Sequence, residues 1–170
     1  YCSEHSTSNN RRIKWYGALL DRFIFRSYDA VAAISQGVAN SLNSRSIVPI
    51  SSISVIENGV PLPEKRLFKR EAVEKECYNL VSIGSLRAAK NYYKVIEALA
   101  LLKQNNWTYT IAGEGDLKDE LSLLIKEKNL EKKVQLVGRV DPIEPLLNEA
   151  DIFIMASSWE GFGLAAVEAM

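Results

Sequence analysis

The sequence predicts an α/β protein built from Rossmann-like parallel sheets with helices on both faces. Short apolar runs of strand length alternate with stretches of helix length, which implies right-handed crossovers between parallel strands. The apolar runs show little polar alternation, as is typical of strands that are covered on both faces. Loops that contain glycine follow several of these runs, where the chain leaves the end of a strand.

The first 60 residues predict a short set of strands and helices. We expect a strand end and loop at Tyr1–Ser6, a helix at Arg11–Arg26, a buried strand at Asp29–Ile34, a helix ending at Leu42 and a strand at Ile53–Glu57. Ser35 precedes the second helix, where a serine side chain can accept a hydrogen bond from a backbone N–H group. Residues 1–60 are therefore interpreted as the last third of a first Rossmann-like domain.

A change of composition separates this part from the rest of the chain. Pro61 and Pro63 are followed by a strongly charged run, Glu64–Glu76. Proline restricts the backbone on both sides of itself, which suits a hinge between domains. Residues 61–78 are therefore predicted to be a linker, and residues 79–170 a second Rossmann-like domain.

The second domain shows the alternation most clearly. Its predicted strands are Asn79–Ile83, Thr108–Ala112, Val134–Val137 and Ile152–Ala156, and its predicted helices are Tyr92–Lys103, Leu117–Lys128, Pro142–Glu149 and Gly163–Met170. In an open parallel sheet, ligands bind outside the carboxyl ends of the strands. Each loop expected there opens on or contains glycine, which predicts a rim of accessible backbone around a phosphate-bearing ligand. These loops are Gly84–Asn91, Gly113–Asp116, Gly138–Asp141 and Ser157–Phe162.

Composition disfavours some classes of function. The 170 residues are 47% hydrophobic and 25% charged, with 21 Lys or Arg against 21 Asp or Glu, so no net charge favours a nucleic-acid partner. Cys2 and Cys77 have no metal-binding spacing and are expected to be free thiols in a reducing compartment. No apolar run approaches the ~20 residues that span a bilayer, and no signal peptide is visible, which favours the cytoplasm. The chain opens on Tyr1 and stops at Met170 inside a predicted helix, so we expect a fragment.

The loop Gly84–Asn91 brings two cations to the predicted sheet edge. Arg87 and Lys90 lie three residues apart and could neutralise the charge of a diphosphate, while Gly84 would allow a ligand to approach the backbone. The alternative for Lys90 is a solvated side chain at the start of a helix, which is disfavoured because cations suit helix C-termini. For Arg87, binding and solvation are evenly balanced.

The last loop carries two carboxylates. Glu160 and Glu168 lie eight positions apart, and Phe162, Gly163 and Leu164 lie between them at a predicted helix start. Unpaired N–H groups there can bind a phosphate or a sugar oxygen, and carboxylates accept hydrogen bonds from sugar hydroxyls. This is the outline of a nucleotide-sugar site. Taken alone, the spacing also fits an ordinary strand, turn and helix with solvated glutamates.

Seven segments of the chain, in order, resemble a known family. They are SEHS, YDAVAAIS, VIENGV, VSIGSLRAAKN, YTIAGEGDL, VQLVGRV and ADIFIMASSWEGFGLAAVEAM. They are similar to the retaining glycosyltransferases of the two-domain GT-B fold, family 4 of the sequence-based classification, whose hallmark is two glutamates separated by seven residues. The resemblance implies a truncated GT-B chain. It would contain the end of an N-terminal, acceptor-side domain and most of a C-terminal, donor-binding domain.

The resemblance also implies roles for individual residues. Lys90 matches the family's diphosphate lysine, and Glu160 and Glu168 match its glutamates, which would orient the donor sugar and the ribose. His5, the only histidine, resembles a first-domain histidine that contacts the donor and assists transfer. A structural or merely exposed histidine is the alternative.

One position departs from the family pattern. Ser85 stands where the family has an arginine directly after the glycine, and Arg87 could substitute for that arginine. No Asp-x-Asp motif, which other sugar-transfer folds use to hold a divalent cation, occurs in the sequence. We therefore expect no metal and no cofactor. The only small-molecule partner expected besides the acceptor is a nucleotide-sugar donor such as a UDP- or GDP-hexose.

The expected function is transfer of a hexose, with retained configuration, to a saccharide or lipid-linked acceptor in cell-surface polysaccharide or lipopolysaccharide synthesis. Two alternatives stay open, a UDP-sugar epimerase of the same fold and a non-catalytic nucleotide-sugar-binding fragment. The basic, aromatic helix at Arg11–Arg26 carries Trp15, Leu19 and Phe23 on one face. This face could touch the inner surface of an anionic membrane or pack against the core.

Overall fold

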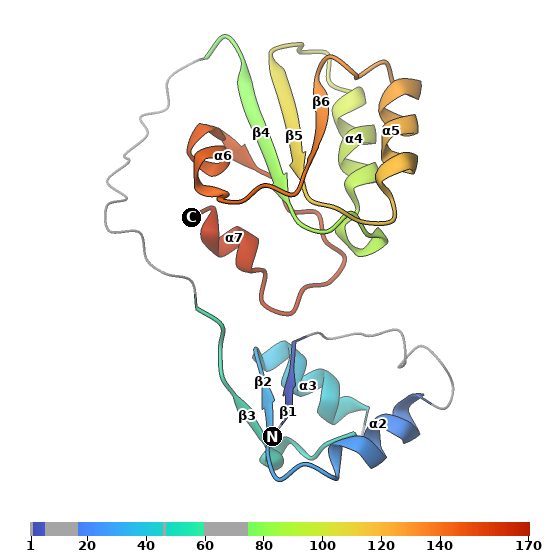
Figure 1. Cartoon of the computed structure of the whole chain (residues 1–170), viewed down its shortest axis with the longest axis vertical. Helices are drawn as coiled ribbons and strands as arrows, with labels where there is room; N and C mark the ends of the chain where they lie inside the picture. Colours follow the sequence, from blue (N-terminus) through green and yellow to red (C-terminus); the bar gives the residue numbers. More distant parts are fainter. Residues whose placement is uncertain (1, 6–16, 46, 60–74) are drawn as a thin grey trace. The chain divides into compact units, whose positions relative to one another are not determined.

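The computed structural model describes residues 2–5, 17–45, 47–59 and 75–170, and these divide into two compact units. The first unit contains the described part of 1–61 together with Trp159–Leu164. The second contains the described part of 62–158 together with Ala165–Met170. Each unit has its own parallel sheet with helices (Figure 1), which confirms the predicted α/β, Rossmann-like class. Residues 60–74 lie outside the described residues, so the boundaries of the linker at 61–78 stay a prediction.

The first unit is a small parallel sheet with two helices. Its strands are β1 (Cys2–Glu4), β2 (Val31–Ala33) and β3 (Ile53–Val55), in that order, and its helices are α2 (Gly17–Phe25), α3 (Gln36–Ser44) and the 3-10 turn η1 (Ile50–Ser52). Buried side chains from α2, β2 and α3, among them Phe25, Val31 and Leu42, form its main core cluster. The predicted elements are therefore present, with strands shorter than expected.

The start of α3 is fixed by the serine that the sequence predicts as its cap. Ser35 has an extended backbone, and its side-chain oxygen accepts a hydrogen bond from the Val38 N–H at 3.3 Å. This bond satisfies one of the N–H groups that a helix leaves unpaired in its first turn. Behind it, Val38, Ala39 and Leu42 are buried, so this face of α3 meets the sheet.

Helix α2 buries a face that the sequence did not indicate. Gly17, Asp21 and Phe25, spaced four apart, are buried, whereas Leu19 is 66% exposed and Phe23 is 79% exposed. Residues four apart share one side of a helix, so Leu19 and Phe23 fall on the side away from the core. The alternative in which this stripe packs against the core is therefore wrong for these two residues. Trp15 and the rest of 11–16 lie outside the described residues.

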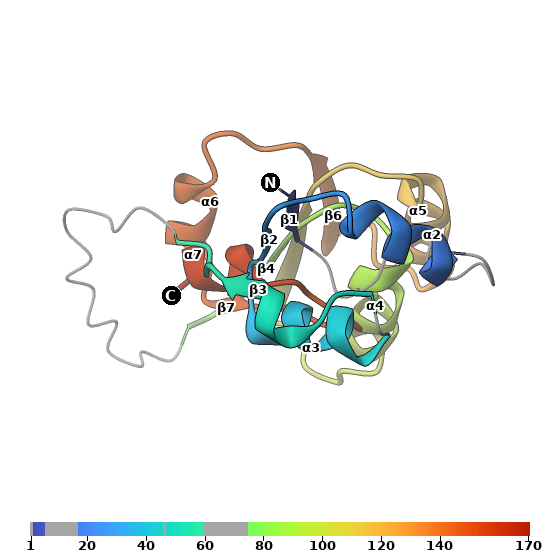
Figure 2. The same cartoon turned by 90° about the horizontal axis from the view of Figure 1, so that it is seen from below.

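The second unit is a four-stranded parallel sheet in the order β6-β5-β4-β7. Its strands are β4 (Tyr78–Ile83), β5 (Trp107–Ala112), β6 (Val134–Gly138) and β7 (Ile152–Phe153), and its helices are η2 (Ala88–Lys90), α4 (Tyr92–Ala100), α5 (Lys118–Glu127), α6 (Glu144–Glu149) and α7 (Leu164–Glu168). In both views, α4 and α5 lie side by side on one face of the sheet, and α6 lies on the other (Figures 1 and 2).

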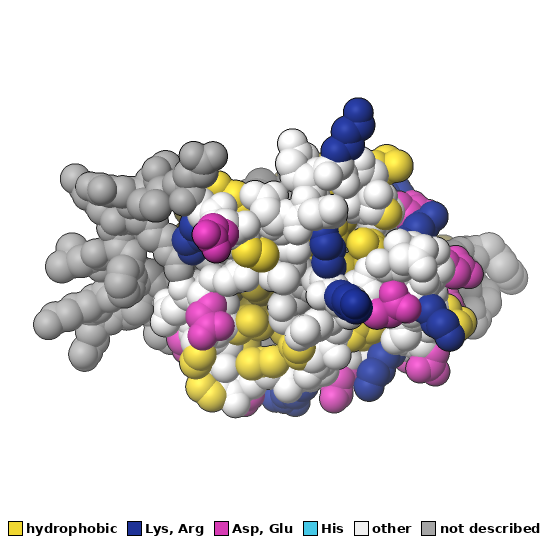
Figure 3. Space-filling view, turned by 90° about the horizontal axis from the view of Figure 1, so that it is seen from above, with side chains coloured by type: hydrophobic (Ala, Val, Ile, Leu, Met, Phe, Trp, Pro, Cys, Tyr) yellow, Lys and Arg dark blue, Asp and Glu magenta, His cyan; other side chains and the backbone are white. Residues whose placement is uncertain are grey.

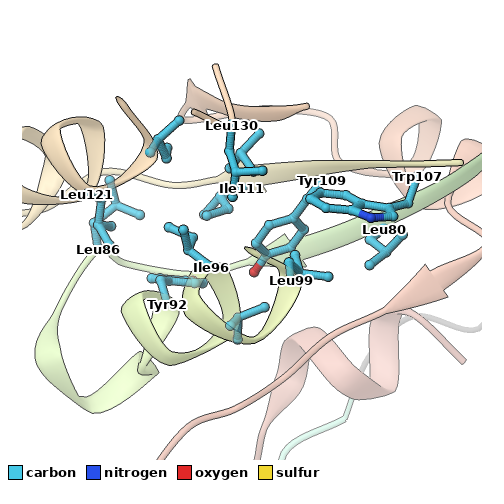
Figure 4. Packing of buried hydrophobic residues seen from close by; sticks show 13 residues of the cluster. Leu80, Leu86, Tyr92, Ile96, Leu99, Trp107, Tyr109, Ile111, Leu121 and Leu130 are labelled. Atoms are coloured by element: carbon cyan, nitrogen blue, oxygen red, sulfur yellow. The ribbon is translucent and has the colours of Figure 1, made fainter. Parts of the chain in front are cut away.

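The core of this unit lies between the sheet and the pair α4 and α5. Tyr109 and Ile111 of β5 meet Ile96 and Leu99 of α4 and Leu121 of α5, and all five are buried (Figure 4). Burial of a large apolar side chain contributes about 1.5–3 kcal/mol, so this cluster anchors both helices. The carboxyl ends of the strands, where ligands bind in such sheets, are thereby held by a packed layer.

Two of the element boundaries that differ from the sequence prediction lie next to candidate site residues. Strand β7 has only the two residues Ile152 and Phe153, because only these pair in register with β4, at Leu80 and Val81. Helix α7 ends at Glu168, before the predicted end at Met170, so this glutamate is its last residue.

Candidate active site

The strand order of the second unit has a switch point between two neighbouring strands, β4 and β7. β4 comes first in the chain, β5 and β6 are added on one side of it, and β7 is added on the other. The sheet is therefore extended from β4 first on one side and later on the other, and such a switch point is where open α/β sheets bind ligands. The loop at residues 84–91 follows β4, and the loop that carries Glu160 follows β7.

Glycines line the carboxyl edge of the sheet, as predicted. The Gly84 N–H donates to the Ala112 carbonyl at 2.9 Å, and the Gly113 N–H donates to the Gly138 carbonyl at 2.7 Å. Gly113 has a φ of 151°, and a Cβ atom there would overlap with the carbonyl oxygen of Gly84. Only glycine fits this approach. The loops after β4, β5 and β6 therefore meet as a continuous rim of backbone.

Lys90 lies directly over this rim. A Cβ atom on Gly84 would lie 3.1 Å from Lys90 Cε and 3.4 Å from Nζ, so the half-buried lysine side chain covers the first glycine. The Tyr92 hydroxyl donates a hydrogen bond to the Gly84 carbonyl at 3.0 Å and so stabilises the same turn. Arg87 precedes η2 and is exposed, as is Ser85. The structure thus brings together Gly84 and Lys90, with Arg87 in the same loop.

Hydrogen bonds join the loop that carries Lys90 to the loop after β7. The buried Asn91 side-chain amide donates to the Ala156 carbonyl at 2.9 Å and to Ser158 Oγ at 2.6 Å. The Ser158 N–H donates to the Ala89 carbonyl at 2.8 Å. Sequence reasoning missed Asn91. An asparagine in front of a helix is ordinarily interpreted as a cap, and only its φ of 53° and its remote partners reveal another role.

A buried polar pair on β4 and β5, Ser82 and Tyr109, was also missed by sequence analysis. Ser82 Oγ donates to the Ile154 carbonyl at 2.6 Å and lies 2.7 Å from the Tyr109 hydroxyl. Because the single Ser82 proton is used on Ile154, Tyr109 is the donor of the second bond. Burial raises the pKa of Tyr109 to about 12. The pair ties β4 to β5 and to the segment after β7.

The first unit holds the other predicted site residues. His5 is exposed at the end of β1, with its Nε2 atom 2.9 Å from Ser3 Oγ. A Cβ atom on Gly161 would overlap with the His5 carbonyl oxygen, so the residue after Glu160 lies against the His5 backbone. Ser35 Oγ donates to the Gly161 carbonyl at 2.8 Å, and Phe162 packs against the cluster of Ala33, Ile34, Val38 and Ala39. His5 and the half-buried Glu160 therefore belong to one local group, which Gly163 and Leu164 continue along the chain.

Glu168 belongs to the second unit, where it is half-buried. The predicted site residues therefore form two groups, one in each unit: His5, Glu160, Phe162, Gly163 and Leu164 in the first, and Gly84, Arg87, Lys90 and Glu168 in the second. The expected roles of Glu160 toward the donor sugar and of Glu168 toward the ribose stay predictions.

Charges of both signs alternate on the surface. Figure 3 shows Lys and Arg interspersed with Asp and Glu on one face, with hydrophobic side chains between them. In the described part of the chain, no three His, Cys, Asp or Glu residues are grouped so that they could hold a metal ion. Both cysteines are free, and none of the described helices is long and apolar enough to cross a bilayer.

The second unit is a Rossmann-like parallel sheet with a glycine rim and a half-buried lysine at its switch point. Comparison with known families identifies it further. The model of the family glycosyl transferases group 1 matches residues 63–170. The chain belongs to this family, as the resemblance of its motifs implied.

Curated relatives cover most of the chain. A Campylobacter jejuni enzyme, N-acetylgalactosamine-N,N'-diacetylbacillosaminyl-diphospho-undecaprenol 4-alpha-N-acetylgalactosaminyltransferase, is 29% identical over 91% of this chain and 43% of its own length. The amylovoran biosynthesis glycosyltransferase AmsK of Erwinia amylovora is 35% identical over 72% of this chain and 32% of its own length. The chain thus spans less than half the length of either relative.

Solved structures share the fold. The crystal structure of Anabaena Alr3699/HepE in complex with UDP-glucose covers 98% of this chain with a TM-score of 0.80, at 18% identity, and the chain covers 49% of it. The likeness supports the GT-B glycosyltransferase fold. The matched 98% of this chain includes residues of both units.

Proposed function

We propose that this chain is the donor-binding part of a glycosyltransferase that moves a hexose from a nucleotide-sugar to a saccharide or lipid-linked acceptor. The single observation that carries the proposal is the position of Lys90 over Gly84, at the switch point between β4 and β7. An ammonium group there meets the diphosphate where open sheets bind phosphate-bearing ligands. Membership of the glycosyl transferases group 1 family supports sugar transfer as the reaction.

In the proposed reaction, the protein supplies charge to the leaving group. As the bond between the sugar C1 and the diphosphate breaks, negative charge builds on the diphosphate oxygen. Lys90 and Arg87, with the backbone N–H groups of Phe162, Gly163 and Leu164, stabilise that charge, so the reaction needs no metal ion. The acceptor hydroxyl attacks C1 from the face that the diphosphate leaves, and its proton passes to the departing diphosphate oxygen. Attack from this face retains the configuration.

The carboxylates and the histidine act on the sugar in this proposal. Glu160 accepts hydrogen bonds from hydroxyls of the transferred hexose, and Glu168 accepts them from the ribose. His5 donates a hydrogen bond to the transferred sugar. The packing of Gly161 against the His5 backbone supports the joint action of His5 and Glu160, because it holds them in one local group.

The names of relatives favour particular partners. The Campylobacter relative is named for a diphospho-undecaprenol acceptor, and an Escherichia coli relative, 32% identical over 69% of this chain, is named a UDP-Gal:alpha-D-GlcNAc-diphosphoundecaprenol galactosyltransferase. We therefore propose a UDP-sugar donor before a GDP-sugar and a lipid-linked acceptor at the cytoplasmic face of a membrane. The exposed Leu19, Leu20 and Phe23 of α2, with Arg22 beside them, support a peripheral membrane contact.

Calorimetric titration with UDP, GDP, UDP-glucose and GDP-mannose tests the donor site. We expect saturable binding of UDP, weakened by about 10- to 100-fold in Lys90→Ala, because a hydrogen bond to a charged group is lost. Glu168→Ala should weaken UDP similarly through the ribose. The controls are Lys94→Ala and Glu97→Ala on the exposed side of α4. Equal affinity in Lys90→Ala and Lys94→Ala would contradict the proposed site.

Product analysis separates the proposed transferase from its alternatives. A transferase releases nucleoside diphosphate from UDP-glucose only when an acceptor is present. An epimerase of the same fold converts the UDP-sugar without an acceptor. Binding by this chain without turnover, together with turnover by a chain of the relatives' full length, identifies a donor-binding fragment.

A further inference from the structure

Asn91 has a backbone conformation that residues with a side chain adopt rarely, although asparagine adopts it more often than most. Its φ of 53° is left-handed, a region that glycine enters more readily than asparagine. Asparagine before a helix ordinarily caps the first turn with its own side chain, yet Asn91 makes no such bond to α4. The helix starts instead on the Asn91 carbonyl, which accepts from Lys94 N at 3.0 Å. The Asn91 side chain therefore does not cap α4.

The Asn91 side chain is used across the switch point. Both of its amide hydrogens have acceptors, the Ala156 carbonyl at 2.9 Å and Ser158 Oγ at 2.6 Å. The residue is 7% exposed, so water can replace these bonds only if the loop opens. A glycine would relieve the backbone but could not make either bond. The amide at this position therefore supplies a link between the two loops that a glycine would lack.

The link holds Lys90 from both sides. The residue before it, Ala89, accepts a hydrogen bond from Ser158 N at 2.8 Å, and the residue after it, Asn91, donates to Ser158 Oγ. The backbone of Lys90 is thus fixed between two bonds to one serine. The lysine side chain extends from this fixed point over Gly84.

We propose that Asn91 is a positioning residue that, through Ser158, holds the Lys90 loop and the loop after β7 as one preorganised wall of the diphosphate site. The proposal rests on the proposed function, since it takes the diphosphate as the ligand of Lys90. Preorganised donors spend no binding free energy on reorganisation when the ligand arrives. Loss of the amide should therefore weaken the diphosphate contact and leave contacts to the nucleoside unchanged.

The test is a titration of Asn91→Gly with UDP and with uridine, or with GDP and guanosine if the base is guanine. We expect the Kd of the diphosphate to rise about tenfold and that of the nucleoside to change less than twofold. Ser158→Ala, which removes one acceptor, should give a smaller rise. The matched control is Asn129→Gly, because Asn129 is also left-handed, with a φ of 56°, but is exposed at the end of α5. An unchanged diphosphate Kd, or an equal loss for the nucleoside, would overturn the positioning role.

Hydrogen exchange of the ligand-free chain distinguishes failure of this inference from failure of the proposed function. The Ser158 amide should exchange at least tenfold faster in Asn91→Gly than in the unmodified chain and in Asn129→Gly. If the unmodified chain binds no nucleotide while this difference is seen, the proposed function fails and the link between the loops stands. If the Ser158 amide exchanges equally in all three chains, Asn91 does not hold the loop and the inference is wrong.

Discussion

Gly113 lies where two loops of the glycine rim touch, and its lack of a side chain is a requirement there. Gly113→Ala should lower the free energy of unfolding by roughly 2–4 kcal/mol, because the new methyl group overlaps with the Gly84 carbonyl oxygen in addition to straining the backbone. Gly138→Ala is the control, since its φ of 73° is also positive but no atom lies within 4 Å of the added Cβ. It should cost only about 1–2 kcal/mol. Urea unfolding measures both, and equal losses would contradict the steric explanation.

Tyr109 makes stability depend on pH in the alkaline range. Unfolding exposes a phenol with the ordinary pKa of 10.0, whereas the folded state holds the proton up to about 12. Above pH 10 the unfolded state loses a proton that the folded state keeps, so this contribution is complete below pH 10 and is lost as pH rises toward 12. The loss amounts to about 1.4 kcal/mol per pH unit.

The variant Tyr109→Phe isolates this contribution. It should be less stable by about 1 kcal/mol at pH 8, where it loses the bond to Ser82, and should lack the alkaline loss due to Tyr109. The difference in unfolding free energy between the two chains, measured by urea titration from pH 8 to 11, should therefore shrink and reverse sign. A constant difference would show that Tyr109 does not ionise on unfolding.

Helix α3 shows how one side chain can serve an element and a loop together. Ser35 Oγ accepts from Val38 N and donates to the Gly161 carbonyl, so Ser35→Ala loses both bonds and should cost about 1–2 kcal/mol. Ser35→Asp keeps the acceptor for the cap but cannot donate to Gly161, and should recover part of this stability. Ser44→Ala, at the exposed end of the same helix, is the control. Thermal unfolding compares the three, and equal values for the first two variants would exclude the cap as the main contribution.

The elements differ in how far the sequence predicts them. Strands β4 and β5 and helix α5 were predicted within about one residue, because their apolar periodicity reflects local burial. The buried face of α2 was not predicted, because Asp21 is buried and Phe23 is exposed only as a result of tertiary packing.

In the candidate site, too, features that depend on local sequence could be predicted, and features that depend on tertiary contacts could not. The glycine rim and Lys90 could be predicted, since strand ends are local signals and the parallel topology brings them to one edge. The Asn91 link could not, because both of its partners, Ala156 and Ser158, are more than 60 positions away in the sequence. A residue that ordinarily caps a helix gives no sign of such a contact.

At the scale of the whole molecule, the exposed apolar face of α2 predicts that the protein binds to a membrane surface. Leu19, Leu20 and Phe23 are exposed, and Arg22 and Arg26 lie on or next to the same helix. Apolar side chains that enter a membrane interface and arginines that meet anionic headgroups together favour binding to a charged bilayer. We therefore expect the chain to float with vesicles that contain phosphatidylglycerol and to float less with vesicles of phosphatidylcholine alone.

Variants of α2 test this location against covering by other protein. Leu19→Ser with Phe23→Ser should reduce the fraction bound to phosphatidylglycerol vesicles at least tenfold, because each side chain contributes about 1 kcal/mol or more of apolar burial. Leu123→Ser, which changes a 63% exposed leucine on α5, should leave binding unchanged. Raised salt should weaken binding of the unmodified chain, since the arginine contribution is screened. Failure of the unmodified chain to float would contradict the membrane contact. It would favour covering of this face of α2 by protein in a chain as long as the relatives, which are more than twice the length of this one.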